Sequence, residues 1–460
     1  MPKQEIRHDR EWNEWREKTF PPLEYKKPID VIKHDTMCLL PFSHFYYAPG
    51  GNIAGCCVNL PDGMNSKTRD TEFIKLVNLD SMKSLRKALI SGKAHSSCEN
   101  CWVSEDMGNG SFRTGHNMEW YDWYKDDIAD ALETYNDETG ELKEFKMRYM
   151  DIRFSNLCNM KCRYCSAGFS SQWEAENIKN NTPEWIGGPI PLTVSDGMQD
   201  QLMMEIIKQI PHLRVINLAG GEPLIEQRNY VILDEIIKQG RAKHIEVKIS
   251  TNGSTAKFKD WDVVEMLSQF KKVHFNISID HSGERAEYMR SGTKWPQLIA
   301  NLKQFQRMGN GVRICIAVSV SAFNYVSFDE CFYELHKEGI INNTMTLSVN
   351  PITMPSFMSP PGVLNNTLKE EGALRWRELM QYCKDNDLTD TPEWYQDLPG
   401  GNDVSVLKFD QIENMLTWVN STSYDEDQVT RFQEHCRHLD DVRKESFNKT
   451  FPELAEMHYV

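Results

Sequence analysis

The chain has 460 residues, of which 40% are hydrophobic, so it is long enough for two or three domains with a sizeable core. Its 67 acidic residues exceed its 52 lysines and arginines, and the formal charge of −15 argues against a broad nucleic-acid-binding surface. Residues 1–20 are too charged for a signal peptide, and no apolar run of about 18 residues, the length of a membrane-spanning helix, occurs. We therefore expect a cytoplasmic protein without membrane association, in which clustered cysteines bind metal rather than form disulfides.

The N-terminal third is predicted to contain a polar arm at residues 1–30 and a small cysteine-rich domain at residues 31–145. Two β-prone runs, residues 44–48 and 53–58, flank a Pro-Gly-Gly turn and predict a hairpin, and a helix is predicted over residues 80–91. These elements bring one set of thiols within reach of a single centre, namely Cys38, Cys56 (or Cys57), Cys98 and Cys101. Four thiolates satisfy either a zinc ion or a 4Fe–4S cluster, and the residues alone do not separate the two.

A second group of cysteines follows a predicted strand at residues 148–154. Cys158, Cys162 and Cys165 have the spacing C-x3-C-x2-C. Three thiolates on one short loop hold three irons of a 4Fe–4S cluster and leave the fourth iron open to another ligand. The alternative is a zinc site that lacks one ligand, and the spacing and the aromatic Tyr164 before the third cysteine disfavour it.

From residue 147 to residue 349 the sequence alternates six predicted strands with helices. This order predicts an α/β fold with a parallel sheet and right-handed crossovers. Six units rather than eight indicate a partial TIM-like barrel, assigned to residues 146–350. Residues 351–460 begin with a proline-rich loop, interpreted as a lid, and continue as a mostly helical extension. In that extension the His-Cys-Arg-His run at residues 435–438 is interpreted as a solvated helix face.

The loop motif resembles the signature of the radical S-adenosylmethionine (radical SAM) superfamily, with Tyr164 as the aromatic residue before the third cysteine. The resemblance implies that SAM chelates the open iron, and that an electron from the reduced cluster splits SAM into methionine and a 5′-deoxyadenosyl radical. That radical takes a hydrogen atom from the substrate, while the protein orients and shields the reaction. The six-unit barrel is similar to the (β/α)6 core of the same superfamily.

The same resemblance implies SAM contacts where the predicted strands end. Gly220-Gly221-Glu222-Pro223 resembles the GGEP motif, whose carbonyl groups and carboxylate accept hydrogen bonds from the SAM ammonium group. Further candidates for contacts with the ribose, carboxylate or adenine of SAM are Ser250, Thr251, Asn252, Ser278, Asp280, Arg290, Val318 and Asn324. For each polar side chain among them, an ordinary role in capping a strand end is an equal alternative.

A second resemblance concerns the N-terminal cysteines. Cys38, Gly51 and Cys56 have the spacing C-x12-G-x4-C, which is similar to the opening of twitch and SPASM domains, the auxiliary-cluster modules of radical SAM enzymes. These modules normally follow the barrel, so the match resembles proteins with an N-terminal twitch domain. It implies one auxiliary 4Fe–4S cluster on Cys38, Cys56, Cys98 and Cys101, with structural zinc as the alternative.

Because twitch and SPASM enzymes often modify peptides, the resemblance favours oxidative modification of a peptide or protein side chain, with the auxiliary cluster relaying an electron. Alternatives are dehydrogenation or rearrangement of a small metabolite, a glycyl-radical-type activase, and a non-catalytic Fe–S electron carrier. We expect a reductant such as flavodoxin or ferredoxin as partner. The catalytic acid or base is left unassigned among Cys315, Cys331, His44, His281 and Tyr288.

Overall fold

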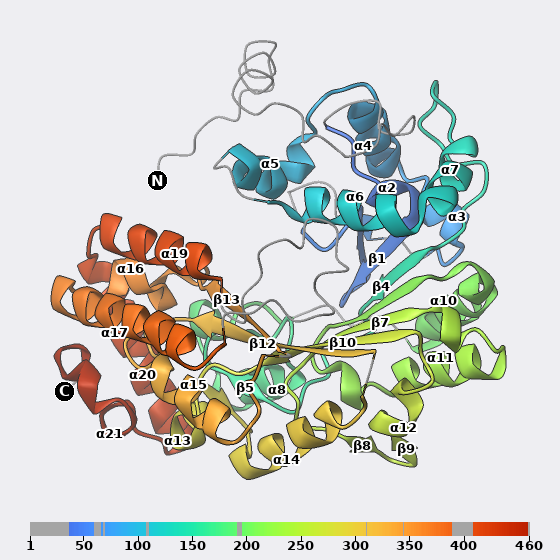
Figure 1. Cartoon of the computed structure of the whole chain (residues 1–460). Coiled ribbons are helices and arrows are strands. Elements are labelled where there is room, and N and C mark those ends of the chain that lie inside the picture. Colours follow the sequence, from blue (N-terminus) through green and yellow to red (C-terminus); the bar gives the residue numbers. More distant parts are fainter. Residues whose placement is uncertain are drawn as a thin grey trace. The chain divides into compact units, whose positions relative to one another are not determined.

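The computed structural model divides the chain into two compact units (Figure 1). The residues that it describes are 36–58, 66–67, 70–106, 110–190, 196–309, 311–343, 345–388 and 408–458. Unit 1 comprises residues 1–155, 192–218 and 231–245, and unit 2 comprises residues 156–191, 219–230 and 246–460. The polar arm predicted at residues 1–30 lies outside the described ranges. No helix within these ranges is long and apolar enough to cross a membrane.

Unit 1 contains the predicted hairpin as part of a larger sheet. β1 (His44–Ala48) pairs antiparallel with β2 (Asn52–Ala54) across the predicted glycine turn. On its other side β1 pairs in parallel with β4 (Tyr149–Ile152), the strand that leads into the cysteine loop (Figure 1). The remaining strands of this unit are β6 (Val215–Leu218), which pairs with β4, and β3 (Ser66–Lys67), which pairs with β2. The predicted boundary after residue 145 therefore falls between neighbouring strands of one sheet.

The helices of unit 1 follow the apolar periodicity of the sequence. The helix predicted over residues 80–91 is α4 (Asp80–Ile90), which buries Met82, Leu85 and Leu89 on one face. This spacing of three and four residues places all three side chains on the same side of a helix. The other helices are α2 (Leu40–Ser43), α3 (Phe73–Leu76), α5 (Glu99–Asp106), α6 (Phe112–Trp123), α7 (Lys125–Glu133) and α10 (Asp196–Gln209).

Unit 2 is built on a parallel sheet. Its strands, in sheet order, are β7 (Glu246–Thr251), β10 (Lys272–Ser278), β12 (Val312–Val320) and β13 (Thr346–Pro351). Side chains alternate between the two faces of each strand. In β10, Val273, Phe275 and Ile277 are buried, and the ring of Phe275 stacks on Phe305 with 4.5 Å between centroids. The predicted α/β fold with a mostly parallel sheet is confirmed.

Helices follow the strands of unit 2 and continue beyond the sheet. Those between the strands are α12 (Val263–Leu267), α13 (Gly283–Met289), α14 (Trp295–Gln306) and α15 (Phe328–Lys337), and α8 (Ser171–Asn180) and α9 (Glu184–Gly187) follow the cysteine loop. α11 (Gln227–Lys238) contains the boundary between the units. In its described residues the C-terminal extension contains α16 (Pro360–Val363), α17 (Asn366–Asp385), α19 (Phe409–Ser421), α20 (Glu426–Arg443) and α21 (Phe447–Thr450).

The C-terminal extension differs from the sequence interpretation in one respect. His435 and Cys436, assigned to a solvated helix face, have no exposed surface. They belong to the buried side of α20 together with Val429, Phe432 and Leu439, an i, i+3, i+7, i+10 pattern that marks an apolar helix face. The proline-rich segment that precedes this region is also ordered, since α16 packs against α20.

Candidate functional site

The cysteine loop, residues 156–167, is fixed through its own backbone. Several of its carbonyl groups accept hydrogen bonds from outside the loop, among them Leu157 from the Glu222 N–H (2.7 Å), Met160 from the Ser170 hydroxyl (2.6 Å), Lys161 from the Arg443 guanidinium (3.0 Å) and Cys162 from the Trp173 indole (2.8 Å). An unpaired buried carbonyl is destabilising, so these donors favour one conformation of an otherwise irregular segment. The backbone that carries the three thiols is therefore held by other parts of the protein.

Gly221 lies against this loop so closely that no side chain fits. A Cβ atom at position 221 would lie 2.2 Å from the Leu157 carbonyl oxygen and 2.6 Å from that of Asn156. Its neighbour Gly220 has φ +130°, which side-chain-bearing residues rarely adopt. Packing against the cysteine loop thus explains Gly221, and the positive φ explains Gly220.

The Glu222 carboxylate joins this turn to the end of β7. Its oxygens accept hydrogen bonds from the Leu224 N–H (3.0 Å), the Thr251 hydroxyl (2.7 Å) and the Asn252 N–H (2.7 Å). Burial raises the pKa of Glu222, and these three donors oppose that rise. Because a carboxylate accepts about four hydrogen bonds, one position remains for the predicted SAM ammonium group.

Asn159, which lies between the first two cysteines, connects the loop to the same strand end. Its side-chain carbonyl accepts a hydrogen bond from the Asn252 amide at 2.9 Å, and its own amide donates to the Ser254 hydroxyl at 2.9 Å. Asn252 is a predicted SAM contact, whereas Asn159 is not among the predicted site residues. The observed contacts give both side chains a part in positioning the loop.

The donor set of the loop fits a cluster with one open iron. Cys158 and Cys165 are partly exposed, Cys162 is buried, and none is in a disulfide. Burial raises the pKa of Cys158 and of Cys165 to about 12 each, so metal binding must displace their protons. Among the residues described, no three His, Cys, Asp or Glu side chains are arranged to hold a single ion. A cubane does not require that arrangement, because each thiolate binds a different iron.

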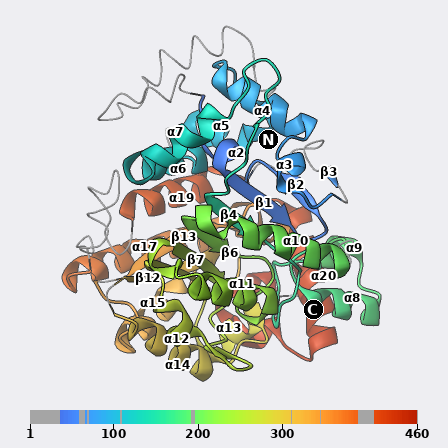
Figure 2. The same cartoon turned by 90° about the vertical axis from the view of Figure 1, so that its right-hand side faces the viewer.

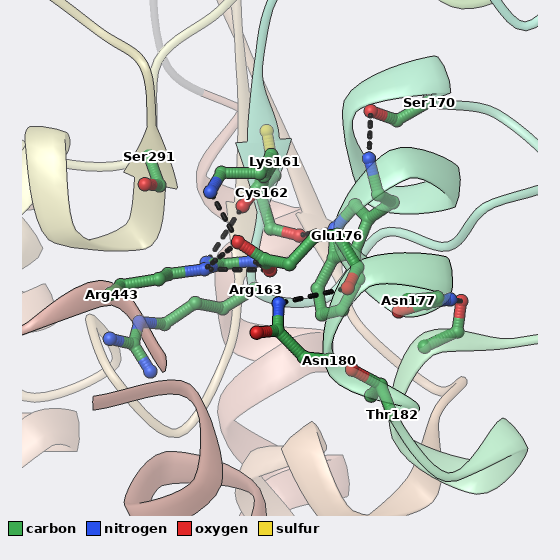
Figure 3. Close-up of polar contacts among 12 residues, drawn as sticks. Lys161, Cys162, Arg163, Ser170, Glu176, Asn177, Asn180, Thr182, Ser291 and Arg443 are labelled. Atoms are coloured by element: carbon green, nitrogen blue, oxygen red, sulfur yellow. Dashed lines mark hydrogen bonds and ion pairs between the residues drawn. The ribbon is translucent and has the colours of Figure 1, made fainter. Parts of the chain in front are cut away.

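The C-terminal extension contacts this loop through a buried ion-pair network. α8 and α20 lie side by side (Figure 2), and Glu176 of α8 accepts hydrogen bonds from Arg443 of α20 at 2.8 and 3.1 Å and from Lys161 of the loop. Figure 3 shows Lys161 and Arg443 converging on the Glu176 carboxylate. Burial raises the pKa of Glu176, but the two cations outweigh it and hold the pKa below its ordinary value.

Arg163, the residue after the second cysteine, makes a second connection to the same region. Its side chain has no exposed surface and donates to Asp440 and Glu445, each at 2.6 Å. The guanidinium also lies 3.5 Å from the centroid of the Tyr288 ring. Residues at the C-terminal end of the chain thus help to fix the segment between Cys162 and Cys165.

Three predicted SAM contacts, Asp280, Arg290 and Asn324, lie close together after the end of β10. The Asp280 carboxylate accepts hydrogen bonds from Arg290 Nε (2.5 Å), the Ser319 N–H (2.6 Å) and the Tyr164 hydroxyl. Asn324 is fully buried, and its amide donates to the Asp280 carbonyl at 2.8 Å.

The remaining predicted contacts are spread over the two faces of the sheet. Ser250 is exposed beside Asn276 of the neighbouring strand, and Ser278 is partly exposed on the same strand as Asn276. Val318 has no exposed surface and lies among the buried side chains of β12. Of the residues considered for acid or base catalysis, Cys315 is partly exposed, and the others are buried: Cys331, His44, His281 and Tyr288.

The N-terminal cysteines form a separate group within unit 1. Cys38 lies within electrostatic range of Cys98 and Cys101, and Cys56 within range of Cys38, Cys98 and its neighbour Cys57. Cys57 instead packs against the cluster of Tyr46, Ala48 and Ala54, on strands β1 and β2. The geometry therefore favours Cys56 over Cys57 as the member of this group.

Two side chains of α6 hold the backbone around Cys38. The Asn117 amide donates to the Met37 carbonyl at 2.7 Å, and its side-chain oxygen accepts from the Leu39 N–H at 3.1 Å. Arg113 donates to the same Met37 carbonyl at 2.8 Å. The position of Cys38 thus depends on side chains of α6.

Residues 152–326 match the family model described as the radical SAM superfamily. The chain carries a radical SAM superfamily domain. This domain contains the cysteine loop, the Gly-Gly-Glu-Pro turn and the Asp280 and Arg290 pair.

Individual relatives are distant. Over 126 residues the chain is 23% identical to Putative protein YfkA of Bacillus subtilis (strain 168), a match that covers 27% of this chain and 28% of that protein. Among solved structures, native anSMEcpe with bound AdoMet is 17% identical, with a TM-score of 0.33 over 56% of this chain and 62% of that one. Streptococcus suis SuiB bound to S-adenosylmethionine is 15% identical, with a TM-score of 0.33 over 66% of this chain and 62% of that one. The chain spans less than two thirds of each.

Replacing Gly221 by alanine should damage the loop of the radical SAM domain. The new methyl group meets backbone atoms, which cannot rotate away, so we expect a loss of about 1–3 kcal/mol in the free energy of unfolding. Gly115 is the matched control, because it is exposed in the interior of α6 and a Cβ there has nothing within 4 Å. Gly115→Ala should stabilise the protein by about 1 kcal/mol. Urea unfolding measures both, and equal stability of Gly221→Ala and the unmodified protein would contradict the packing argument.

The Glu176 network predicts a pH-dependent stability. In Glu176→Gln, Arg443 stays buried without its partner, and we expect a loss of about 3–5 kcal/mol at neutral pH. The folded pKa lies below the ordinary value of 4.5, so the carboxylate stabilises fully above pH 4.5 and loses its effect as the pH falls through the folded pKa. The difference between the two proteins should therefore shrink below pH 4.5.

Urea unfolding across this pH range tests the prediction. Glu205→Gln is the control, since Glu205 pairs with the exposed Lys208 and its loss should cost less than about 1 kcal/mol. A Glu176→Gln difference that stays constant down to the acid transition would show that the carboxylate charge is not responsible.

Proposed function

We propose that the protein is a radical SAM enzyme that cleaves S-adenosylmethionine reductively and removes a hydrogen atom from a substrate with the 5′-deoxyadenosyl radical. The observation that supports this most is the cysteine loop, with three thiols held by fixed donors inside the radical SAM domain. When bound by Cys158, Cys162 and Cys165, a 4Fe–4S cluster offers one open iron to SAM and supplies the electron that breaks its sulfonium bond.

The protein's own part in this reaction is to orient and to exclude water. Backbone groups at Gly220 and Gly221 and the free acceptor position of Glu222 are the proposed contacts of the SAM amino group. Residues at the ends of the following strands, Ser250, Asn252, Ser278 and Asp280, are proposed to bind the ribose and carboxylate. Glu222, Asn252 and Asp280 already bond to other protein atoms, so SAM would meet side chains whose positions are set.

One face of the sheet in unit 2 presents exposed polar side chains among the described residues, and this supports a polar substrate. This face is opposite to the buried row of Phe275, and it presents Ser250, Asn276 and Asn350 as exposed side chains. Hydroxyl and amide groups bind partners that donate and accept hydrogen bonds. We propose oxidative modification of a peptide or protein side chain, which makes the enzyme an oxidoreductase. Dehydrogenation or rearrangement of a small metabolite, such as a sugar, nucleotide or amino acid, is the second candidate and uses the same face.

An auxiliary 4Fe–4S cluster is part of the proposal. Cys38, Cys56, Cys98 and Cys101 are its proposed ligands, and together they make a twitch-like module. When bound there, such a cluster accepts the electron that remains on the oxidised substrate and relays it onward. A cytoplasmic reductant such as flavodoxin or ferredoxin would supply the electron for SAM cleavage.

The assignment of Cys56 rather than Cys57 to this module predicts different iron contents. After anaerobic reconstitution, Cys56→Ala should lose about four iron atoms per chain relative to the unmodified protein. Cys57→Ala should keep them, because its thiol faces a different set of side chains. Iron and sulfide assays measure the difference, and bound zinc in place of iron would support the structural-zinc alternative. The reverse result for the two variants would contradict the assignment.

The main proposal predicts that the reduced protein releases 5′-deoxyadenosine from SAM. Chromatography of an anaerobic incubation measures the product. Cys158→Ala should abolish it, because the cluster then lacks one of its three thiolates, and Cys57→Ala should not change it. A non-catalytic electron carrier would give no 5′-deoxyadenosine. An activase would give one equivalent and then require its partner.

A further inference from the structure

Arg290 is paired with the second cysteine of the loop by backbone geometry. β11 (Arg290–Ser291) and β5 (Lys161–Cys162) form a two-stranded antiparallel ribbon in which Arg290 lies opposite Cys162. Side chains directly opposite each other in such a ribbon lie on the same face and contact one another. Arg290 Nη1 lies 3.6 Å from Cys162 Sγ, within hydrogen-bonding distance for sulfur.

The guanidinium is held in this position from its other edge. Arg290 Nε donates to the Asp280 carboxylate at 2.5 Å, and Asp280 has no exposed side-chain surface. The Ser319 N–H and the Tyr164 hydroxyl fix the same carboxylate. A guanidinium stays protonated in proteins, so Arg290 places a positive charge beside Cys162.

A charged donor beside a cluster-ligating sulfur has a known physical consequence. Hydrogen bonds to the sulfur atoms and the net charge around an iron–sulfur cluster set its reduction potential. Reduction adds a negative charge to the cluster, so a nearby cation stabilises the reduced form and raises the potential. Asp280 acts in the opposite direction, because its negative charge partly cancels that of Arg290.

We propose that Arg290 sets the reduction potential of the cluster on the cysteine loop through its hydrogen bond to Cys162, and that Asp280 and Tyr164 position it for this role. The proposal rests on the proposed function, since it requires a cluster on Cys158, Cys162 and Cys165. It assigns Arg290 a role that is independent of any contact with the SAM carboxylate. Arg290 is thus a positioning and tuning residue for the cluster.

The test is a redox titration of the anaerobically reconstituted full-length protein without SAM. Electron paramagnetic resonance follows the reduced cluster, and its signal is identified as the one that is absent in Cys158→Ala. Arg290→Gln should shift the midpoint potential to more negative values, because the positive charge is lost. Arg290→Lys should produce a smaller negative shift, since the charge stays but the fork that bridges Asp280 and Cys162 is lost. Asp280→Asn should shift the potential in the positive direction.

The control is Arg285→Gln, which removes ion pairs to Glu330 and Glu453 without a contact to the cysteine loop. Its potential should equal that of the unmodified protein. SAM affinity is measured in parallel for each variant. A weaker affinity for SAM in Arg290→Gln with an unchanged potential would overturn the inference and leave the proposed function intact. If no signal depends on Cys158, both proposals fail.

Discussion

The structure of the radical SAM domain depends on satisfying the backbone of one irregular loop. A segment that carries three thiols within eight residues forms no helix and only the two-residue strand β5, so most of its carbonyl groups need donors from elsewhere. Those donors come from the Gly-Gly-Glu-Pro turn, from α8 with the serine that caps it, and from α20. The distances between the sulfur atoms are therefore a property of three separate segments of the chain. This explains why the C-terminal extension, which contains no proposed ligand, takes part in shaping the cysteine loop.

Because the loop and the strand ends need hydrogen-bond partners, the polar residues of the site bond to protein atoms as well as being proposed SAM contacts. Glu222 binds three protein donors, and Asp280 also binds three, before any ligand arrives. Carboxylates of this kind are rigid, because displacing one would leave several buried donors unpaired. SAM would then meet preorganised groups and would lose little free energy in ordering them. A role in capping a strand end and a role in binding SAM, which are alternatives for an isolated residue, are compatible here.

Local patterns predicted much of this arrangement. The strands of the sheet, the cysteine loop and the glycine turn could be predicted because each depends on periodicity or spacing within a few residues. The partners of Lys161 and Arg163 could not be predicted, because they lie as many as 282 residues away in the sequence. Arginines on a terminal helix ordinarily face solvent, and no local signal marks Arg443 as an exception. The burial of His435 and Cys436, in contrast, could have been predicted from the apolar spacing of α20. The polar residues at positions 435–438 favoured the wrong interpretation.

The charges of Arg290 and Asp280 beside the cysteine loop bear on how the loop would bind a cluster. Burial raises the pKa of the three thiols, which favours their protonated form. A cluster bound there would replace these protons, and thiolate charge would then lie beside Arg290. A guanidinium without Asp280 would be an uncompensated buried charge in the metal-free chain. The acidic partner thus keeps the cation in place while the site is assembled, and the same pair limits how strongly the cation acts on the cluster once it has formed.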